Sequence, residues 1–385
     1  MHPTQMVCIV IVVVAALMVH ASSEVLAADD SDASFRGEPF PLIVYGVGLS
    51  EGTFAQVKAW GATHVHRYGM GMDIHADQAY FDLAEKFGLK VMSDLGGTRR
   101  TKEDGGLEAM RAYVEHFRDH PALGFWYLYD EPSGKITQDK LQLYYDMIAS
   151  ITPDVPVGVA HAWTTGWGSY RSTQDVLLND LYPVTGLPFP EAKLDQLTRF
   201  TEAAVRVGPV AVPILQIFNW RVMAAAGERE VRGFPLRQLR YPNDAEMRYM
   251  AFASIGMGVR GLAFYSHARM AMDDRSWGDR VLTPLLQEVR AFTAEINAAA
   301  MERLGQAAHD LSLTVWQTGE KTLALLASGK GKAQSVCFDT GGLLANGNLE
   351  PWGRTRVAEV TLAEGVISMD SMEPWEVMIW EVAGQ

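Results

Sequence analysis

The 385-residue chain is acidic, and its composition is that of an ordinary soluble globular protein, with 48% hydrophobic and 21% charged residues. Its formal net charge of −13 disfavours nucleic acid and anionic membrane as main partners, because both carry negative charge themselves. The length exceeds one average domain and fits one large α/β domain with a small second one.

Residues 1–28 have the pattern of a secretory signal peptide. The segment 6–19 is almost unbroken in apolar residues, too short for a comfortable membrane span of about 20 residues, and small residues suited to cleavage follow at 25–28. We therefore predict export to the periplasm or the cell exterior, no other membrane contact, and a polar linker over 29–40. The exported chain keeps one cysteine, Cys337, so no intramolecular disulfide can form.

Strand-like and helical segments alternate between residues 41 and 302. The predicted strands are 42–47, 62–68, 89–95, 123–130, 155–161, 176–182, 212–218 and 261–267. The predicted helices are 54–60, 77–87, 108–116, 138–151, 191–206, 244–257 and 283–302. This rhythm is typical of a (β/α)8 barrel over 41–302. A doubly wound sheet is the alternative, but no glycine-rich phosphate loop follows the first strand.

The residue pattern of the sequence changes after Gly305. Short, often alternating segments at 311–317, 322–327, 333–339, 357–361 and 375–382 are separated by Gly, Asn and Asp turns. This pattern predicts a small C-terminal antiparallel β-sandwich over 309–383 that packs on the barrel.

The most informative stretch is 123–132, in which a run of apolar and aromatic residues ends at Asp130-Glu131-Pro132. Such a run is typical of a strand buried on both faces in a parallel sheet. Carboxylates at the carboxyl end of such a strand lie where α/β barrels place their chemistry. Asp130 and Glu131 are therefore the first candidates for an active site.

The ends of the other predicted strands supply the remaining candidates. Carboxylates, aromatic rings and amides gather there with almost no lysine, a mixture suited to stacking on and hydrogen bonding to sugar rings. Cleaving a glycosidic bond needs a proton donor and a second carboxylate. The candidate substrate contacts are Asp130, Arg67, Asp94, His161, Trp163, Tyr182, Gln216, Trp220, Tyr265 and His267.

The Asp130-Glu131-Pro132 motif and the strand rhythm of 41–300 resemble the (β/α)8-barrel glycoside hydrolase superfamily, in particular clan A with its Asn-Glu-Pro at the end of strand four. A similar Tyr-Asp-Glu-Pro with a later Asp-x-Tyr-Pro occurs in bacterial barrel proteins of uncertain function. The resemblance implies Glu131 as general acid/base and Asp130 as a contact to the sugar hydroxyl beside the anomeric carbon. The clan's nucleophile is a Glu ending strand seven, where this chain has Gln216, which cannot act as a nucleophile.

Asp180 is the candidate for the second carboxylate. It ends the sixth predicted strand in Asn179-Asp180-Leu181-Tyr182-Pro183, and it shares a strand face with Tyr182 by the two-residue period. Strands four and six are two apart in the ring, so Glu131 and Asp180 can approach each other across the mouth. A capping or arginine-pairing role for Asp180 remains open at this point. So does the stereochemical outcome, retention or inversion of configuration at the anomeric carbon.

The sequence thus predicts a glycosidase that acts on a poly- or oligosaccharide without a cofactor, with Glu131 as proton donor and Asp180 as second carboxylate. Gln216 motivates an alternative, a non-catalytic carbohydrate-binding barrel. A third possibility is a metal-dependent hydrolase, because His64-Val-His66 is similar to the His-x-His of amidohydrolase metal sites. Arg67 follows it directly and does not suit a zinc pocket, so we expect no metal. The sugar, the mode of cleavage and the oligomeric state stay open.

Overall fold

Eight parallel strands close into a barrel in the order β1-β10-β7-β6-β5-β4-β3-β2. The computed structural model describes residues 40–98, 106–164, 166–186, 194–207, 210–297, 300–305, 311–319 and 321–384. The predicted signal peptide and nearly all of the predicted linker lie outside these residues. The barrel strands are β1 Leu42–Val44, β2 His64–Arg67, β3 Lys90–Asp94, β4 Leu123–Asp130, β5 Val157–His161, β6 Val176–Asp180, β7 Val210–Gln216 and β10 Leu262–Tyr265. The predicted (β/α)8 barrel is confirmed.

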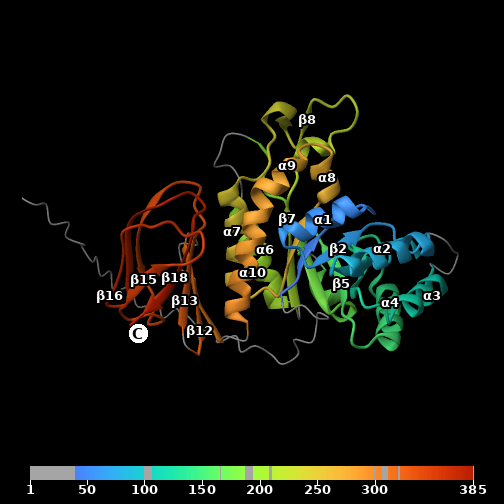
Figure 1. Ribbon diagram of the computed structural model, residues 1–385, viewed down its shortest axis with the longest axis horizontal. Coiled ribbons are helices and arrows are strands. Elements are labelled where there is room, and N and C mark those ends of the chain that lie inside the picture. Colours follow the sequence, from blue (N-terminus) through green and yellow to red (C-terminus); the bar gives the residue numbers. More distant parts are fainter. Residues whose placement is uncertain are drawn as a thin grey trace, which may run out of the picture.

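Helices surround the barrel and cover the outer faces of its strands (Figure 1). They are α1 Glu51–Trp60, α2 Ile74–Lys86, α3 Leu107–Phe117, α4 Gln138–Ile151, α5 Trp167–Tyr170, α6 Leu194–Val207, α7 Asp244–Gly256, α8 His267–Ala271, α9 Arg275–Trp277 and α10 Thr283–Ile296. Each of these helices is too short or too polar to cross a membrane within the described part of the chain.

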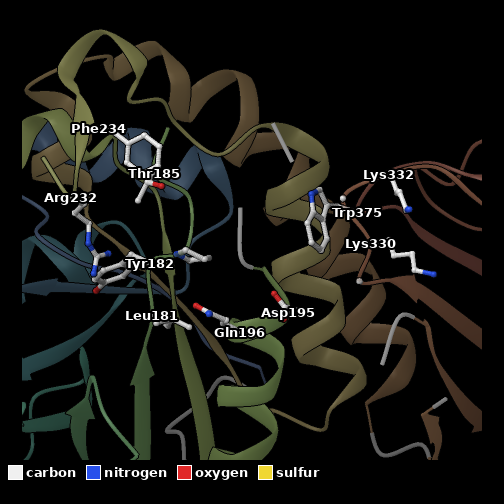
Figure 2. Close-up of a pocket in the computed structure, with 13 residues that line it drawn as sticks. Leu181, Tyr182, Thr185, Asp195, Gln196, Arg232, Phe234, Lys330, Lys332 and Trp375 are labelled. Atoms are coloured by element: carbon white, nitrogen blue, oxygen red, sulfur yellow. The ribbon is translucent and has the colours of Figure 1, made fainter. Parts of the chain in front are cut away.

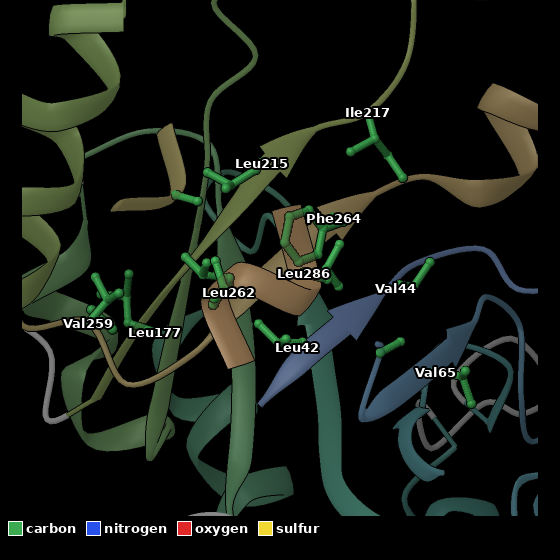
Figure 3. Close-up of a cluster of buried hydrophobic side chains, with 14 of the residues drawn as sticks. Leu42, Val44, Val65, Leu177, Leu215, Ile217, Val259, Leu262, Phe264 and Leu286 are labelled. Atoms are coloured by element: carbon green, nitrogen blue, oxygen red, sulfur yellow. The ribbon is translucent and has the colours of Figure 1, made fainter. Parts of the chain in front are cut away.

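Alternation along each strand separates two cores. On β1, Leu42 and Val44 point outward into the core beneath the helices, whereas Ile43 points into the barrel. Figure 3 shows the outer core, where Leu42 and Val44 lie with Leu262 and Phe264 of the neighbouring strand β10. Both faces of the strands are therefore buried, which explains their continuous apolar runs.

The C-terminal domain contains a five-stranded sheet, β11-β12-β13-β18-β15, and a three-stranded sheet, β14-β17-β16. One buried cluster combines side chains of both, including Leu326 of β13 and Ile367 of β17, so the two sheets pack face to face. The strands are β11 Ala300–Gly305, β12 Leu311–Thr318, β13 Lys321–Ser328, β14 Gln334–Asp339, β15 Asn348–Pro351, β16 Val360–Ala363, β17 Val366–Met372 and β18 Val377–Ala383. The β-rich C-terminal domain is confirmed.

The last predicted barrel helix is shorter than expected. We predicted a helix over 283–302, but α10 ends at Ile296 and β11 begins at Ala300. Residues of β11 pair in antiparallel register with β12, as in Met301 with Trp316. The Ala-rich sequence favours a helix, but pairing with a neighbouring strand overrides that local preference.

Helix α7 joins the two domains. It contacts β7 of the barrel on one side and β13 and β18 of the C-terminal sheet on the other, and it is buried along almost its whole length. Its Arg248 pairs with Glu288 of α10 (Nη2–Oε1 2.8 Å) and donates to the Val377 carbonyl of β18. These buried charged contacts fix the C-terminal domain against the barrel.

Candidate functional site

The carboxyl ends of the barrel strands form a mouth lined by tyrosines and carboxylates. Tyr45 follows β1, Tyr127 lies on β4, and Tyr265 ends β10, with their side chains turned toward the barrel axis. The ring of Tyr45 lies edge-on to those of Tyr127 and Tyr265, with centroids 5.8 and 6.1 Å apart. The carboxylates of β4 and β6 lie beside this aromatic floor.

A β-bulge in β4 turns Asp130 into the barrel. Tyr127 pairs with Gly158 and Tyr129 pairs with the next residue of β5, Val159, so β4 carries one extra residue. As a result Leu128 and Tyr129 both pack against the outer core, and Asp130 faces inward. There the Tyr127 hydroxyl donates to Asp130 Oδ1 at 2.8 Å.

Glu131 leaves the strand at the rim of the mouth. Its backbone has φ of 54°, a left-handed conformation that is uncommon for a residue other than glycine. Its amide donates to the Ala160 carbonyl at 2.9 Å, which ties this conformation to β5. The carboxylate pairs with Lys135 (Oε2–Nζ 3.0 Å), and 39% of the side chain is exposed.

Asp180 ends β6 with its side chain toward the mouth. Burial, together with the negative charges of Glu131 and Asp130, raises the pKa of Asp180 from 3.8 to about 7. The Tyr182 hydroxyl donates to Oδ2 at 3.4 Å, whereas Oδ1 is buried without a hydrogen-bond partner among the described residues. A substantial fraction of Asp180 therefore keeps its proton near neutral pH.

Little side-chain volume separates β4 from β6. The inward-facing residues of the intervening strand β5 are Gly158 and Ala160. A Cβ atom added to Gly158 would lie 2.8 Å from Leu178 and 3.2 Å from Phe125, so a larger residue there would have to displace the Leu178 side chain. The charge on Glu131 therefore acts on Asp180 without a large side chain of β5 between them.

Aromatic rings border the β6 to β10 side of the mouth. Tyr182 stacks on Tyr265 at 5.4 Å, and Trp220 lies 6.2 Å from Tyr182. The Arg232 guanidinium lies 4.2 Å from the centroid of the Trp220 ring. Trp163, on the loop after β5, is 68% exposed and can present its ring to a ligand from solvent.

Asp94 lies at the mouth but is held by backbone groups. It accepts hydrogen bonds from the amides of Gly69 (2.6 Å) and Gly96 (2.9 Å), which join the loops after β2 and β3. With Tyr68 and Asp130 it lines a cavity of about 580 Å³ beside the mouth. Its position is compatible with a substrate contact, and its bonds also give it a structural role.

Three of the predicted substrate contacts lie in the outer layer of the barrel, away from the mouth. Arg67 points outward from β2, pairs with Asp77 and lies 5.2 Å from the centre of the Tyr80 ring. His161 points outward from β5 and bonds Gln174 at 3.1 Å. His267 bonds Gln56 at 3.4 Å and packs on Trp60 beneath the helices. Strand alternation turns Arg67 and His161 outward, whereas His267 lies beyond the end of β10, at the start of helix α8.

Gln216 lies at the end of β7, where the resembling family has its nucleophile, but its amide is used inside the protein. Its nitrogen donates to the carbonyls of Val184 (2.7 Å) and Phe218 (3.0 Å), and its oxygen accepts from the Val184 amide (3.0 Å). The side chain is fully buried. Gln216 therefore fixes the loop after β6, which carries Tyr182, and does not face the mouth as a substrate contact.

Replacing Gln216 by glutamate should destabilise the protein. A carboxylate cannot donate to the two carbonyls and would be buried without a cation, so we expect the free energy of unfolding to fall by about 2 to 5 kcal/mol. Urea unfolding of Gln216→Glu measures this loss of stability. The matched control is Gln196→Glu, the same substitution at an exposed position of α6. Equal unfolding midpoints for Gln216→Glu and the wild type would contradict the structural role.

The histidines of the His-x-His motif both point into the barrel. His64 bonds Thr63 (Nδ1–Oγ1 2.8 Å), and burial lowers the pKa of His64 and of His66 to about 3. Within the described ranges, no group of three or more His, Cys, Asp and Glu side chains is arranged to hold a metal ion. The motif therefore lacks further ligands there.

A second, larger cavity of about 840 Å³ lies between the barrel and the C-terminal domain. Figure 2 shows Tyr182 and Thr185 on the barrel side, Arg232 and Phe234 near the short hairpin of β8 Glu230–Val231 and β9 Phe234–Pro235, and Trp375 on the side of the C-terminal domain. Because Tyr182 also bonds Asp180, this cavity adjoins the mouth.

Sequence reasoning missed Tyr45 and Tyr127 as parts of the mouth. Tyr45 lies two residues after the inward-facing Ile43, so strand alternation could have identified it. Tyr127 was hidden by the bulge, because alternation counted back from Asp130 assigns Tyr127 to the opposite face.

Several solved structures with a similar fold are glycoside hydrolases. A family 5 glycoside hydrolase from Bacteroides vulgatus has a TM-score of 0.61 at 12% sequence identity, over 90% of this chain and 90% of its own. An α-amylase from Anoxybacillus has 0.58 at 11% identity, over 90% and 98%. An α-amylase from Geobacillus thermoleovorans, complexed with acarbose, has 0.58 at 8% identity, over 90% and 99%. No protein-family model and no curated protein matches the sequence. At 8 to 12% identity, these similarities confirm the fold that the resemblance implies.

Proposed function

We propose that the protein hydrolyses glycosidic bonds of a poly- or oligosaccharide with Glu131 and Asp180 as its catalytic carboxylates. The observation that carries the proposal is the contrast between these two groups at one mouth. Asp180 is buried, and its pKa is raised to about 7, whereas Glu131 lies at the rim beside Lys135. Two carboxylates in different environments are what this reaction requires.

The environments favour Asp180 as the proton donor, the reverse of the assignment that the resemblance implies. Asp180 retains a proton near neutral pH and can give it to the glycosidic oxygen as the bond to the anomeric carbon breaks. Glu131 is then the second carboxylate, which supports the positive charge at that carbon. Water supplies the hydroxyl group that ends on the anomeric carbon, and its remaining proton restores Asp180.

The surroundings of the pair suit sugars. Tyr182, Tyr265 and Trp220 form an aromatic cluster beside Asp180, and sugar rings pack on aromatic side chains while their hydroxyls bond to carboxylates. The structurally similar α-amylase with bound acarbose is compatible with this reading. We further propose, from the apolar segment 6–19, that the protein acts after export.

The test is hydrolysis by Glu131→Gln. We expect the wild type to release reducing ends from an oligosaccharide and Glu131→Gln to lose about 100-fold or more of this activity while it still binds the sugar. Reducing-end release and isothermal titration calorimetry measure the two properties. Turnover by Glu131→Gln equal to that of the wild type would refute the assignment.

A non-catalytic carbohydrate-binding barrel is the second candidate, favoured by Gln216. The buried amide takes the position of the family's nucleophile and is engaged with Val184 and Phe218. This candidate predicts sugar binding by the wild type and by Glu131→Gln, with no reducing ends released by either.

A further inference from the structure

His66 is the most unusual polar side chain in the barrel. It points inward from β2, is fully buried, and neither ring nitrogen has a hydrogen-bond partner among the described residues. Three tyrosine rings enclose it, with centroid distances of 4.4 Å to Tyr45, 4.5 Å to Tyr68 and 5.1 Å to Tyr127. Buried polar groups in proteins are nearly always paired, so this arrangement requires an explanation.

Filling space does not explain a histidine at this position. Burial keeps the imidazole neutral, with a pKa lowered to about 3, so it supplies no charge to the carboxylates nearby. A phenylalanine would fill similar volume among these rings without two unpaired nitrogens. A neutral imidazole is, however, both a donor and an acceptor, which matches a sugar hydroxyl group.

Other unpaired polar atoms gather at the same mouth. Asp180 Oδ1 and Trp220 Nε1 are also buried without a partner among the described residues. Asp180 and His66 belong to inward-facing positions of β6 and β2, and the aromatic floor of Tyr45, Tyr127 and Tyr265 lies between these strands. A ligand with several hydroxyl groups would satisfy such a set together.

Tyr68 stands over His66. It contacts the rings of His66, Tyr45, Tyr127 and Tyr265, yet 42% of it is exposed, whereas His66, Tyr45 and Tyr127 are fully buried. The following amide, of Gly69, is held by Asp94, so the backbone is fixed. No hydrogen bond from the Tyr68 hydroxyl to a described residue restrains the ring.

We infer that His66 is a sugar-binding residue at the base of the reacting subsite and that the entering sugar displaces the Tyr68 ring to reach it. The inference rests on the proposed function and specifies which part of the mouth holds the substrate. A rotation of Tyr68 about its side-chain bonds uncovers the imidazole while the loop stays in place. One ring nitrogen then donates to a sugar hydroxyl oxygen, and the other accepts from a hydroxyl group.

The experiment uses Glu131→Gln protein with ¹⁵N-labelled histidine and four probes: cellotetraose, maltotetraose, xylotetraose and mannotetraose. We expect one probe to shift the ring nitrogen signals of His66 and to leave those of His64 in place. Adding His66→Phe should weaken binding of that sugar at least tenfold without lowering the unfolding temperature. His64→Phe is the matched control, because His64 lies on the same strand and face and is equally buried.

Tyr68→Ala adds an independent measurement in the absence of sugar. Removing the ring should expose His66 to water, so the pKa of His66 should rise toward the ordinary histidine value. Sugar binding that leaves the His66 signals unmoved and survives His66→Phe would overturn this inference and leave the proposed function standing. Failure of all four probes to bind would overturn both.

Discussion

Replacing Asp180 by asparagine should slow hydrolysis of an oligosaccharide by about 100-fold to 10,000-fold, the range for loss of a general acid. An amide cannot give a proton to the glycosidic oxygen, whereas the carboxyl group of Asp180, with its pKa raised to about 7, can. Because asparagine has nearly the same shape, the change should appear in kcat and leave KM nearly constant. Steady-state kinetics with a reducing-end assay measures both.

The control for this prediction is Asp175→Asn. Asp175 lies just before β6, at the opposite end of the strand from Asp180, and accepts hydrogen bonds from Tyr145 (2.7 Å) and the Val157 amide (2.8 Å). An asparagine oxygen can accept one of these bonds, so activity should stay close to that of the wild type. Equal activity of Asp180→Asn and the wild type would remove Asp180 from the mechanism.

Asp180→Asn should also stabilise the folded protein at alkaline pH. The pKa of Asp180 is about 7 in the folded state, against an ordinary aspartate value of 3.8, so between these pH values the folded state binds the proton more tightly than the unfolded state. Stability therefore falls as the pH rises through this window, and above it the full cost of the buried charge is present. Asparagine carries no charge, so it avoids a cost of up to about 4 kcal/mol.

Urea unfolding near pH 4 and near pH 8 tests this prediction. Asp180→Asn should unfold at a higher urea concentration than the wild type near pH 8 and at nearly the same concentration near pH 4. Asp175→Asn should show no gain that depends on pH in this way. A gain of equal size at both pH values would mean that the ionisation of Asp180 is not its source.

The sequence predicts the barrel well because its strands are buried on both faces. Strand β4 and helix α4 have the predicted bounds, since a continuous apolar run and a strongly periodic helix are unambiguous signals. Strand β15 was missed because it is an edge strand with mostly exposed residues, which carry no apolar pattern. Strand β17 was also missed. A bulge opposite Gln334 and Val336 of β14 interrupts the alternation of its buried and exposed residues.

The site was harder to predict than the fold because it depends on which way each side chain points. The bulge in β4 could not be seen in the sequence, and without it Asp130 would point outward. His161 was placed at the mouth because it ends a strand, yet alternation with the inward-facing Ala160 turns it away. The roles of Glu131 and Asp180 depend on burial and neighbouring charges, which only the assembled barrel provides.

The most direct test of the two-carboxylate mechanism is the dependence of hydrolysis on the leaving group in Asp180→Asn and Glu131→Gln. In an aryl glycoside with an acidic phenol, the phenolate can leave without receiving a proton. A missing general acid therefore slows the hydrolysis of such a glycoside only a little. We predict that Asp180→Asn hydrolyses such a glycoside nearly as fast as the wild type, while Glu131→Gln stays impaired. The opposite pattern, with activity restored only in Glu131→Gln, would contradict the assignment of Asp180 as the proton donor.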